Sequence, residues 1–385
     1  MATIHNIRKL GYSNLNLDLR GLTKAFTSTM LPLSARCRAL LHEGCEVRLE
    51  LPEDHKLARL MENSNWAHLI DPREYAPSTF AAGSHLPAIV YNNEAQQFEA
   101  VDKIVNFVLQ NMDLDNRAQL GALEWAVNEI ADNVLNHAES RIGGIVQVNA
   151  HRDKAIEFVV CDAGLGIPRT LRSTHPYLTS DSEALDRAIR EGVTRDQERN
   201  QGNGLYGSYR LAQLSNGYFH INSGYASLAY TEKSGFRSVR QDVPYPGSSI
   251  VCAVKLNDSE LLSEALTFKG KRYSPYTYVD RLEEQKTVKI DLSTECRSFG
   301  SRAVAQPLRM KIENILKTTD AQIVLELSDV ALITSSFADE VFGKIFVLLG
   351  PIGFSNRIVV SGTNKIVRQL IDRSIMQRMA TNNMG

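Results

Sequence analysis

The sequence predicts an α/β (α+β) chain with more than one domain, and two features of its pattern lead to this prediction. Near both ends, strand-like and helix-like stretches alternate, which is typical of small α/β layers. Between them, a helix-like stretch at 115–138 is followed by short runs of β-branched and apolar residues that glycine turns separate, which is typical of strands.

The composition is that of a globular protein. The 385 residues are 43% hydrophobic and 23% charged, enough for two or three domains with apolar cores. The formal net charge of -1 gives no overall attraction to nucleic acid or to an anionic membrane. Since no apolar run could span a bilayer and the first residues lack a signal-peptide pattern, we expect a cytoplasmic protein. The five cysteines show no C-x-x-C spacing, so neither a disulfide framework nor structural zinc is indicated.

The first motif lies in the helix-like stretch 115–138, where apolar residues recur every three or four positions. Glu129 and Asn133 are four residues apart, so both side chains project from one face of the helix. A carboxylate beside an amide oxygen suits a magnesium–nucleotide site, because Mg²⁺ prefers oxygen ligands and keeps waters that the carboxylate can orient or deprotonate. Taken alone, the pair is more typical of a solvated helix surface.

The second motif follows a strand-like run at 156–161, which ends at Asp162 and then breaks into the turn Ala163-Gly164-Leu165-Gly166. The carboxylate is therefore expected at a strand end, where a glycine turn lets a ligand approach the backbone. We expect Asp162 to accept a hydrogen bond from an exocyclic amine of a ligand.

The third motif, Gly202-Asn203-Gly204-Leu205-Tyr206-Gly207, precedes a helix-like run at 208–214. Free amide groups and the positive end of that helix would face an anion such as a phosphate. The motif does not follow a strand in a compact βαβ unit, which argues against a dinucleotide-binding site.

In this order and spacing, the three motifs resemble the GHKL superfamily, the ATP-binding fold shared by DNA gyrase, histidine kinases, the heat-shock chaperone ATPase and mismatch-repair proteins. The resemblance covers roughly residues 95–258 and implies a Bergerat-type two-layer sandwich that binds ATP and Mg²⁺. The resemblance implies that Glu129 is the general base or water-orienting carboxylate and that Asn133 is the magnesium ligand. For adenine, it implies Asp162 as the binding carboxylate, Gly164 and Gly166 as the turn beneath the base, and Ser248 or, preferred here, Ser249 as an assisting hydroxyl. The phosphate loop would consist of Gly202, Asn203, Gly204, Leu205 and Gly207.

The same resemblance makes residues 168–201 the ATP lid. Its many charges and few large apolar residues predict a mobile flap that only a ligand orders. The lid contains four arginines, Arg187, Arg190, Arg195 and Arg199. Each of them either meets the γ-phosphate or a partner, or is a solvated charge of the flap. The ending 133–138 is most similar to the anti-sigma-factor serine kinases, and no upstream helical hairpin carries a phosphoacceptor histidine, so a conventional histidine kinase is not expected.

Further strands complete the central domain. The runs 145–150 and 156–161 are predicted to pair through a turn at 152–154, and 218–223 and 227–231 to form a hairpin around Gly224. A last strand is predicted at 250–256, and Tyr245-Pro246-Gly247 before it is interpreted as a turn signal.

Both flanks share one pattern. Near the start, strands at 15–19 and 46–51 enclose a helix at 30–43, and a further short helix is expected at 56–64. Near the end, strands at 321–327 and 357–360 are each followed by a helix, at 337–349 and 365–374. Without gaps, 17–19 align with 325–327 and 27–28 with 335–336, a faint repeat or a coincidence.

Both flanks resemble the STAS-like fold of anti-sigma-factor antagonists, the C-terminal one over roughly 285–380. Ser336 is similar in place to the serine that a partner kinase phosphorylates in those antagonists, although Thr334 stands where they carry an acidic residue. The alternative for this hydroxyl is that it caps the helix.

These resemblances predict three domains, at 1–90, 95–258 and 275–385. They imply an ATP-hydrolysing regulatory protein or an anti-sigma-like protein serine kinase, with protein partners or self-association through the STAS-like domains. Two alternatives stay open: an ATP-driven conformational or dimerisation switch, and a scaffold that binds nucleotide without turnover. Glu129 argues against the scaffold, since a pure binder needs the magnesium ligand but not the base.

Overall fold

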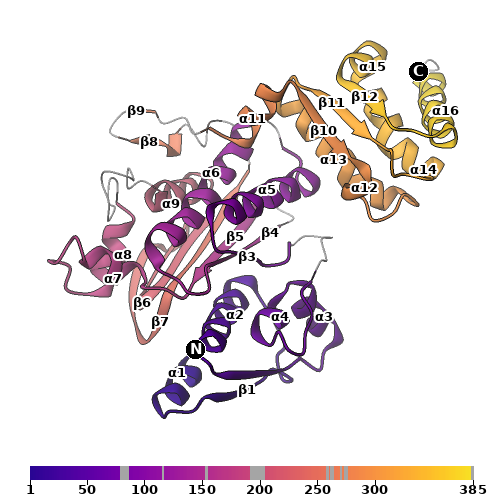
Figure 1. The fold of residues 1–385 in the computed structure, drawn as a ribbon. Helices are drawn as coiled ribbons and strands as arrows, with labels where there is room; N and C mark the ends of the chain where they lie inside the picture. Colours follow the sequence, from indigo (N-terminus) through magenta and orange to yellow (C-terminus); the bar gives the residue numbers. More distant parts are fainter. Residues whose placement is uncertain are drawn as a thin grey trace. The chain divides into compact units, whose positions relative to one another are not determined.

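A five-stranded antiparallel sheet of order β3-β4-β5-β7-β6 forms the centre of the computed structural model (Figure 1). The structure describes residues 1–78, 86–114, 117–151, 155–190, 204–256, 260, 264–268, 271–272 and 276–382. The strands are β3 (Ile89–Tyr91), β4 (Gly144–Ala150), β5 (Ala155–Asp162), β6 (Tyr218–Thr231) and β7 (Gly235–Lys255). The helices of this part are α5 (Glu94–Asn111), α6 (Arg117–Asn133), α7 (Ile167–Arg172), α8 (Asp181–Ala188) and α9 (Gly204–Leu214), with a π-helical turn η1 (Val134–Ala138) after α6. The predicted pairing of these two strands, β4 and β5, is confirmed, while the predicted turn at 152–154 lies outside the described residues.

An N-terminal lobe covers one face of this sheet, while α5, α6 and α9 lie over the other (Figure 1). The lobe consists of α1 (Ala2–Lys9), β1 (Asn14–Asp18), α2 (Thr27–His42), β2 (Glu46–Glu50), α3 (His55–Asn63) and α4 (Trp66–Ile70). Strands β1 and β2 pair in parallel, as alternating strands and helices require. The strands and helices predicted within 15–64 are therefore confirmed.

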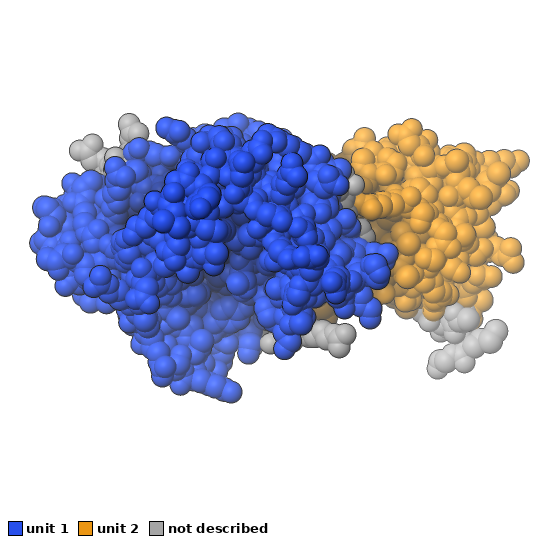
Figure 2. Space-filling model, turned by 90° about the horizontal axis from the view of Figure 1, so that it is seen from below, with its two compact units in different colours: residues 1–104, 122–274 blue, residues 105–121, 275–385 orange. Residues whose placement is uncertain are grey.

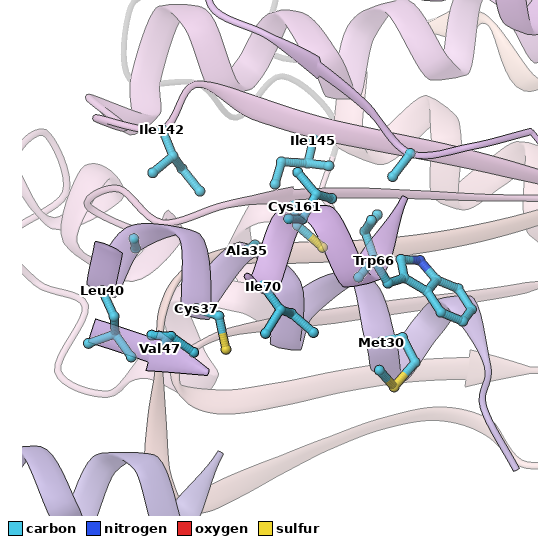
Figure 3. Close-up of a cluster of buried hydrophobic side chains, with 14 of the residues drawn as sticks. Met30, Ala35, Cys37, Leu40, Val47, Trp66, Ile70, Ile142, Ile145 and Cys161 are labelled. Atoms are coloured by element: carbon cyan, nitrogen blue, oxygen red, sulfur yellow. The ribbon is translucent and has the colours of Figure 1, made fainter. Parts of the chain in front are cut away.

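One apolar cluster joins the lobe to the sheet (Figure 3). Trp66 and Ile70 of α4, together with Leu40 of α2, belong to the same cluster as Ile145 of β4 and Cys161 of β5. The indole N–H of Trp66 donates to Oε1 of Gln147 at 2.7 Å, which satisfies a buried polar group on the covered face. Strand β5 and most of β4 are consequently buried on both faces.

The chain divides into two compact units (Figure 2). Unit 1 consists of residues 1–104 and 122–274, so it contains the domain predicted at 1–90 and all but residues 105–121 of the one predicted at 95–258. Unit 2 consists of residues 105–121 and 275–385. A short hairpin of β8 (Thr267–Phe268) and β9 (Lys271–Arg272) lies near the end of unit 1.

Unit 2 contains a three-stranded parallel sheet of order β10-β11-β12. Its elements are α11 (Tyr278–Gln285), β10 (Thr287–Asp291), α12 (Leu292–Glu295), α13 (Arg302–Thr318), β11 (Gln322–Glu326), α14 (Ser335–Ala338), η2 (Asp339–Gly343), α15 (Lys344–Arg357), β12 (Ile358–Ser361) and α16 (Lys365–Asn382). The strands predicted at 321–327 and 357–360 and the helix at 365–374 are confirmed. The predicted helix at 337–349 continues to Arg357, with a kink where Gly350 has φ 68°.

Two predictions in the central domain are wrong. The runs 218–223 and 227–231 form one strand, β6, with a bulge at Gly224, rather than a hairpin. The real turn lies between β6 and β7, so the segment 245–247 is part of β7 instead of a loop before a strand. The bulge lets a single strand change its register at a glycine with φ 57°, which resembles a turn in sequence.

Candidate functional site

Glu129 and Asn133 lie on the last two turns of α6. The apolar side of this helix is fully buried, since Leu123, Val127 and Ile130 have no exposed surface. The two polar residues are four positions apart on the other side and are partly buried. The helix predicted at 115–138 is confirmed over the described residues 117–138 as α6 and η1, and a left-handed residue, Glu139 with φ 52°, ends it.

The first residue of α9 lies directly against this pair. A Cβ atom placed on Gly204 would lie 2.6 Å from Oε2 of Glu129 and 3.6 Å from Nδ2 of Asn133. Only a residue without a side chain fits at 204 while Glu129 keeps its position. The helix start predicted to bind phosphate therefore meets the carboxylate predicted to act as the base and the amide predicted to bind magnesium. Gly202 and Asn203 lie outside the described residues.

The other two residues of the third motif make packing contacts. A Cβ atom on Gly207 would lie 2.2 Å from the Trp125 ring, so this glycine lets α9 approach α6 closely. Leu205 packs against a small apolar cluster made by the helices α7 and α8. In the structure, these two residues position α9, and Gly204 alone of the three touches the Glu129 and Asn133 pair.

Asp162 is buried at the end of β5, with 2% of its surface exposed. The Gly164 N–H donates to one carboxylate oxygen at 2.8 Å and the Ser248 N–H to the other at 3.1 Å. Burial raises the pKa of Asp162 to about 6, while these hydrogen bonds lower it in part. The carboxylate therefore carries a desolvation cost when it is ionised.

Glycine backbone forms the wall beside this carboxylate. Gly247 has φ 88°, and a Cβ atom on it would lie 2.6 Å from Oδ1 of Asp162. Gly166 has φ 78°, and a Cβ atom there would lie 2.8 Å from the Gly247 carbonyl oxygen and from Oγ of Ser223. The sequence offered only a turn signal at 245–247, so the contact of Gly247 with Asp162 was missed.

Ser248, rather than Ser249, is the serine beside Asp162. Ser249 lies opposite Cys161 in the ladder between β5 and β7, and its hydroxyl accepts a weak hydrogen bond from the Cys161 thiol at 3.5 Å. Neighbouring residues of a strand point to opposite faces, so a shift of one position decides which hydroxyl reaches a ligand.

The turn after β5 is fastened to the end of the helix that carries the first motif. The Leu165 N–H donates to the carbonyl oxygen of Ala138 at 2.7 Å, and a Cβ atom on Gly164 would lie 1.9 Å from the same oxygen. The Tyr91 hydroxyl donates to the carbonyl oxygen of Ala131 at 3.2 Å, and the nearby charge of Asp162 adds to the burial that raises the pKa of Tyr91. The first and second motifs are thereby brought to one edge of the sheet.

Glu129 titrates in the neutral range. Burial raises its pKa to about 7, and the neighbouring carboxylate of Asp132 adds to the shift. A carboxylate with a pKa near the working pH can both accept and return a proton, which is the property of an efficient general base.

The described part of the predicted lid, residues 168–190, is folded. Ser180 and Glu183 form a capping box at the start of α8, and Asp181 accepts hydrogen bonds from Arg172 at 2.5 Å and from the N–H of Tyr225 at 2.6 Å. Leu171, Leu178, Ala184 and Ala188 form a small core of their own. The prediction that only a ligand orders the flap is wrong for residues 168–190, while Arg195 and Arg199 lie outside the described residues.

Ser336 lies in unit 2, in the first turn of α14, and is exposed. The hydroxyl that caps this helix belongs to Thr334, which accepts a hydrogen bond from the Phe337 N–H at 3.2 Å. The capping role that was the alternative for Ser336 is therefore filled by another residue.

The described residues contain neither a cluster of metal-ligating side chains nor a helix that could cross a membrane. Within these residues, no group of three or more His, Cys, Asp or Glu side chains could hold a metal ion. None of the described helices is both long enough and apolar enough to cross a membrane.

Comparisons with known proteins give two matches. Residues 119–253 match the family described as histidine kinase-, DNA gyrase B-, and HSP90-like ATPase. Residues 304–368 match the family described as STAS-like domain of unknown function (DUF4325). None of the curated proteins compared with the chain matches it.

The glycine beside Asp162 gives a stability prediction with a matched control. Gly247→Ala should destabilise unit 1 by at least about 2 kcal/mol more than Gly235→Ala, because overpacking adds to left-handed strain. Gly235 also lies in β7 with φ 62°, but a Cβ atom there meets nothing within 4 Å. Urea unfolding of both variants measures the difference, and equal losses would contradict the contact of Gly247 with Asp162.

The raised pKa of Asp162 gives a pH prediction. Since the folded pKa of about 6 exceeds the ordinary aspartate value of 3.8, the contribution of Asp162 to the unfolding free energy is fully present below the lower value and is lost as pH rises through the higher one. Asp162→Asn removes this titration. Between about pH 4 and pH 8, the unfolding free energy of the wild type should therefore fall by on the order of 3 kcal/mol more than that of the variant. Unfolding free energies across this range test it. A difference between the two proteins that stays constant with pH would show that Asp162 does not titrate there.

Proposed function

Since the chain carries a GHKL-type ATPase domain and a STAS-like domain, we propose that it is a regulatory ATPase that binds Mg-ATP at the edge of the central sheet. The observation that carries this proposal is the contact of Gly204 with both Glu129 and Asn133. A helix start, a carboxylate and an amide meet there, and each suits a different part of a magnesium triphosphate.

Asp162 would recognise the adenine amine. An ionised carboxylate has about four lone-pair sites, and the N–H groups of Gly164 and Ser248 occupy two of them. Because Gly247 and Gly166 have no side chains, their backbone packs closely around this carboxylate. Ser248 would supply the assisting hydroxyl.

Asn133 would hold the metal through its amide oxygen. Mg²⁺ is usually bound by one or two protein oxygens together with substrate phosphates and water, so a single amide fits its needs. When bound, the ion would neutralise part of the triphosphate charge. Glu129 lies one helical turn away, where it would orient a water molecule and accept its proton.

A protein serine kinase that acts on a STAS-like domain is the second candidate. The observation that favours it is the exposure of Ser336 in the first turn of α14, with the cap supplied by Thr334. A phosphate added in the first turn of a helix is stabilised by the free N–H groups and the positive dipole.

The catalytic role of Glu129 can be separated from binding. Glu129→Gln keeps the size of the side chain but removes its basicity, so turnover should fall about 10²- to 10⁴-fold. Nucleotide affinity should change by less than roughly tenfold, because the base acts in the transition state. Phosphate release and ADP titration measure the two effects, with Glu99→Gln, on the exposed side of α5, as control. Normal hydrolysis by Glu129→Gln would exclude this residue as the base.

Incubation with γ-labelled ATP separates the two candidates. A kinase that modifies its own STAS-like domain should label the chain in the wild type and in Ser335→Ala, but not in Ser336→Ala. An ATPase should release labelled phosphate and leave all three proteins unlabelled. Label that persists in Ser336→Ala would exclude this serine as the phosphoacceptor.

A further inference from the structure

The helix that carries Glu129 and Asn133 begins in the other compact unit. The division of the chain places the end of α5 and the start of α6, residues 105–121, with residues 275–385 of the STAS-like part. From Ala122 onward, α6 belongs to unit 1. Glu129 and Asn133 therefore lie on a helix whose first turn belongs to unit 2.

Asn314 of α13 holds the connection before α6. Its side chain is 1% exposed and its amide N–H groups donate to the carbonyl oxygens of Leu109 at 2.8 Å and Met112 at 2.6 Å. Its amide oxygen accepts a hydrogen bond from the Leu114 N–H at 3.1 Å. A helix end leaves its last carbonyl groups without partners in the helix, and Asn314 supplies a partner for one of these groups in α5, that of Leu109, and for the carbonyl group of Met112 just after it.

Charged and polar contacts surround this hydrogen-bonded turn. Lys317, one turn after Asn314 on α13, donates to Asp113 at 2.6 Å and to the Leu114 carbonyl oxygen at 3.2 Å. Gln110 of α5 donates to Glu295 at 2.8 Å, and Glu295 also pairs with Lys311 of α13. Leu114 itself has no exposed surface, so the turn is packed as well as hydrogen-bonded.

We propose that Asn314 is a positioning residue for the ATP site and that the STAS-like part sets nucleotide affinity and turnover through α6. An α-helix is stiff over a length of 17 residues, so a change at its first turn shifts or frays the turns that follow. Any ligand, partner or phosphate that moves α13 would then alter the site, and nucleotide would alter the turn in return. This inference rests on the proposed function only for the nature of the ligand.

The decisive experiment compares two variants of the full chain by amide hydrogen exchange. Asn314→Asp places a carboxylate against the carbonyl oxygens of Leu109 and Met112, which should speed exchange of residues 122–133 by roughly tenfold or more. Val367→Ala removes buried volume from α16 of the same unit, which packs on α14, α15 and η2, and should leave exchange of 122–133 unchanged. Lys317→Ala, a milder change at the surface, should act in the same direction as Asn314→Asp if that variant does not fold.

Wild-type protein gives the reciprocal measurement. ADP with Mg²⁺ should slow exchange of residues 109–114, and Asn314→Asp should weaken ADP binding by about tenfold relative to Val367→Ala. Protection confined to unit 1, or unchanged exchange of 122–133 in an Asn314→Asp protein whose turn has loosened, would overturn the proposal. If the wild type bound no nucleotide, the proposed function would fail, while the comparison of variants would still decide whether the turn controls α6.

Discussion

The carbonyl group of Ala138 is the point on which the geometry of the site depends. It accepts the Leu165 N–H and leaves no space for a side chain at Gly164, so it joins the π-helical end of α6 to the turn after Asp162. Two motifs that are more than twenty residues apart in the chain are thereby held in one arrangement. The π-helical turn η1 presents this carbonyl group to the turn, and such turns are often found at functional sites.

The same edge of the sheet concentrates buried acidic groups. Glu129, Asp132 and Asp162 all have raised pKa values, in each case chiefly through burial. Burying carboxylates without a cation costs folding free energy, and a protein retains such a cost most often where it serves function. A bound magnesium nucleotide would offset this cost at two places. The metal ion would bring a positive charge near Glu129, and the adenine amine would donate a hydrogen bond to Asp162.

Sequence reasoning succeeded where a local pattern fixes the outcome. The period of α6 places Glu129 and Asn133 on one face, and the strand that ends at Asp162 follows from its apolar run. The outlines of β1, β2, β11 and β12 follow from alternation with helices. The resemblances predicted for the central and C-terminal parts match family models, while the STAS-like resemblance of the N-terminal lobe stays a prediction.

Sequence reasoning failed where contacts between segments that are distant in the chain determine the local structure. Gly207 meets Trp125 and Gly247 meets Asp162, and nothing within either local sequence distinguishes these contacts from an anion loop or a turn. The glycine at 224 resembles a hairpin turn in sequence. In the structure it is required because a Cβ atom there would lie 2.3 Å from Asp181, forty-three positions away, and no local pattern records this contact. Ser248 and Ser249 differ only in register, which depends on the pairing partner.

The most direct test is calorimetric titration of the full chain with a non-hydrolysable Mg-ATP analogue, in the wild type and in Asp162→Asn. The account predicts one site in the wild type and a loss of about 10- to 150-fold in affinity in the variant, the value of a hydrogen bond to a charged group. Absence of binding to the wild type at millimolar nucleotide, or equal affinity in the two proteins, would contradict it.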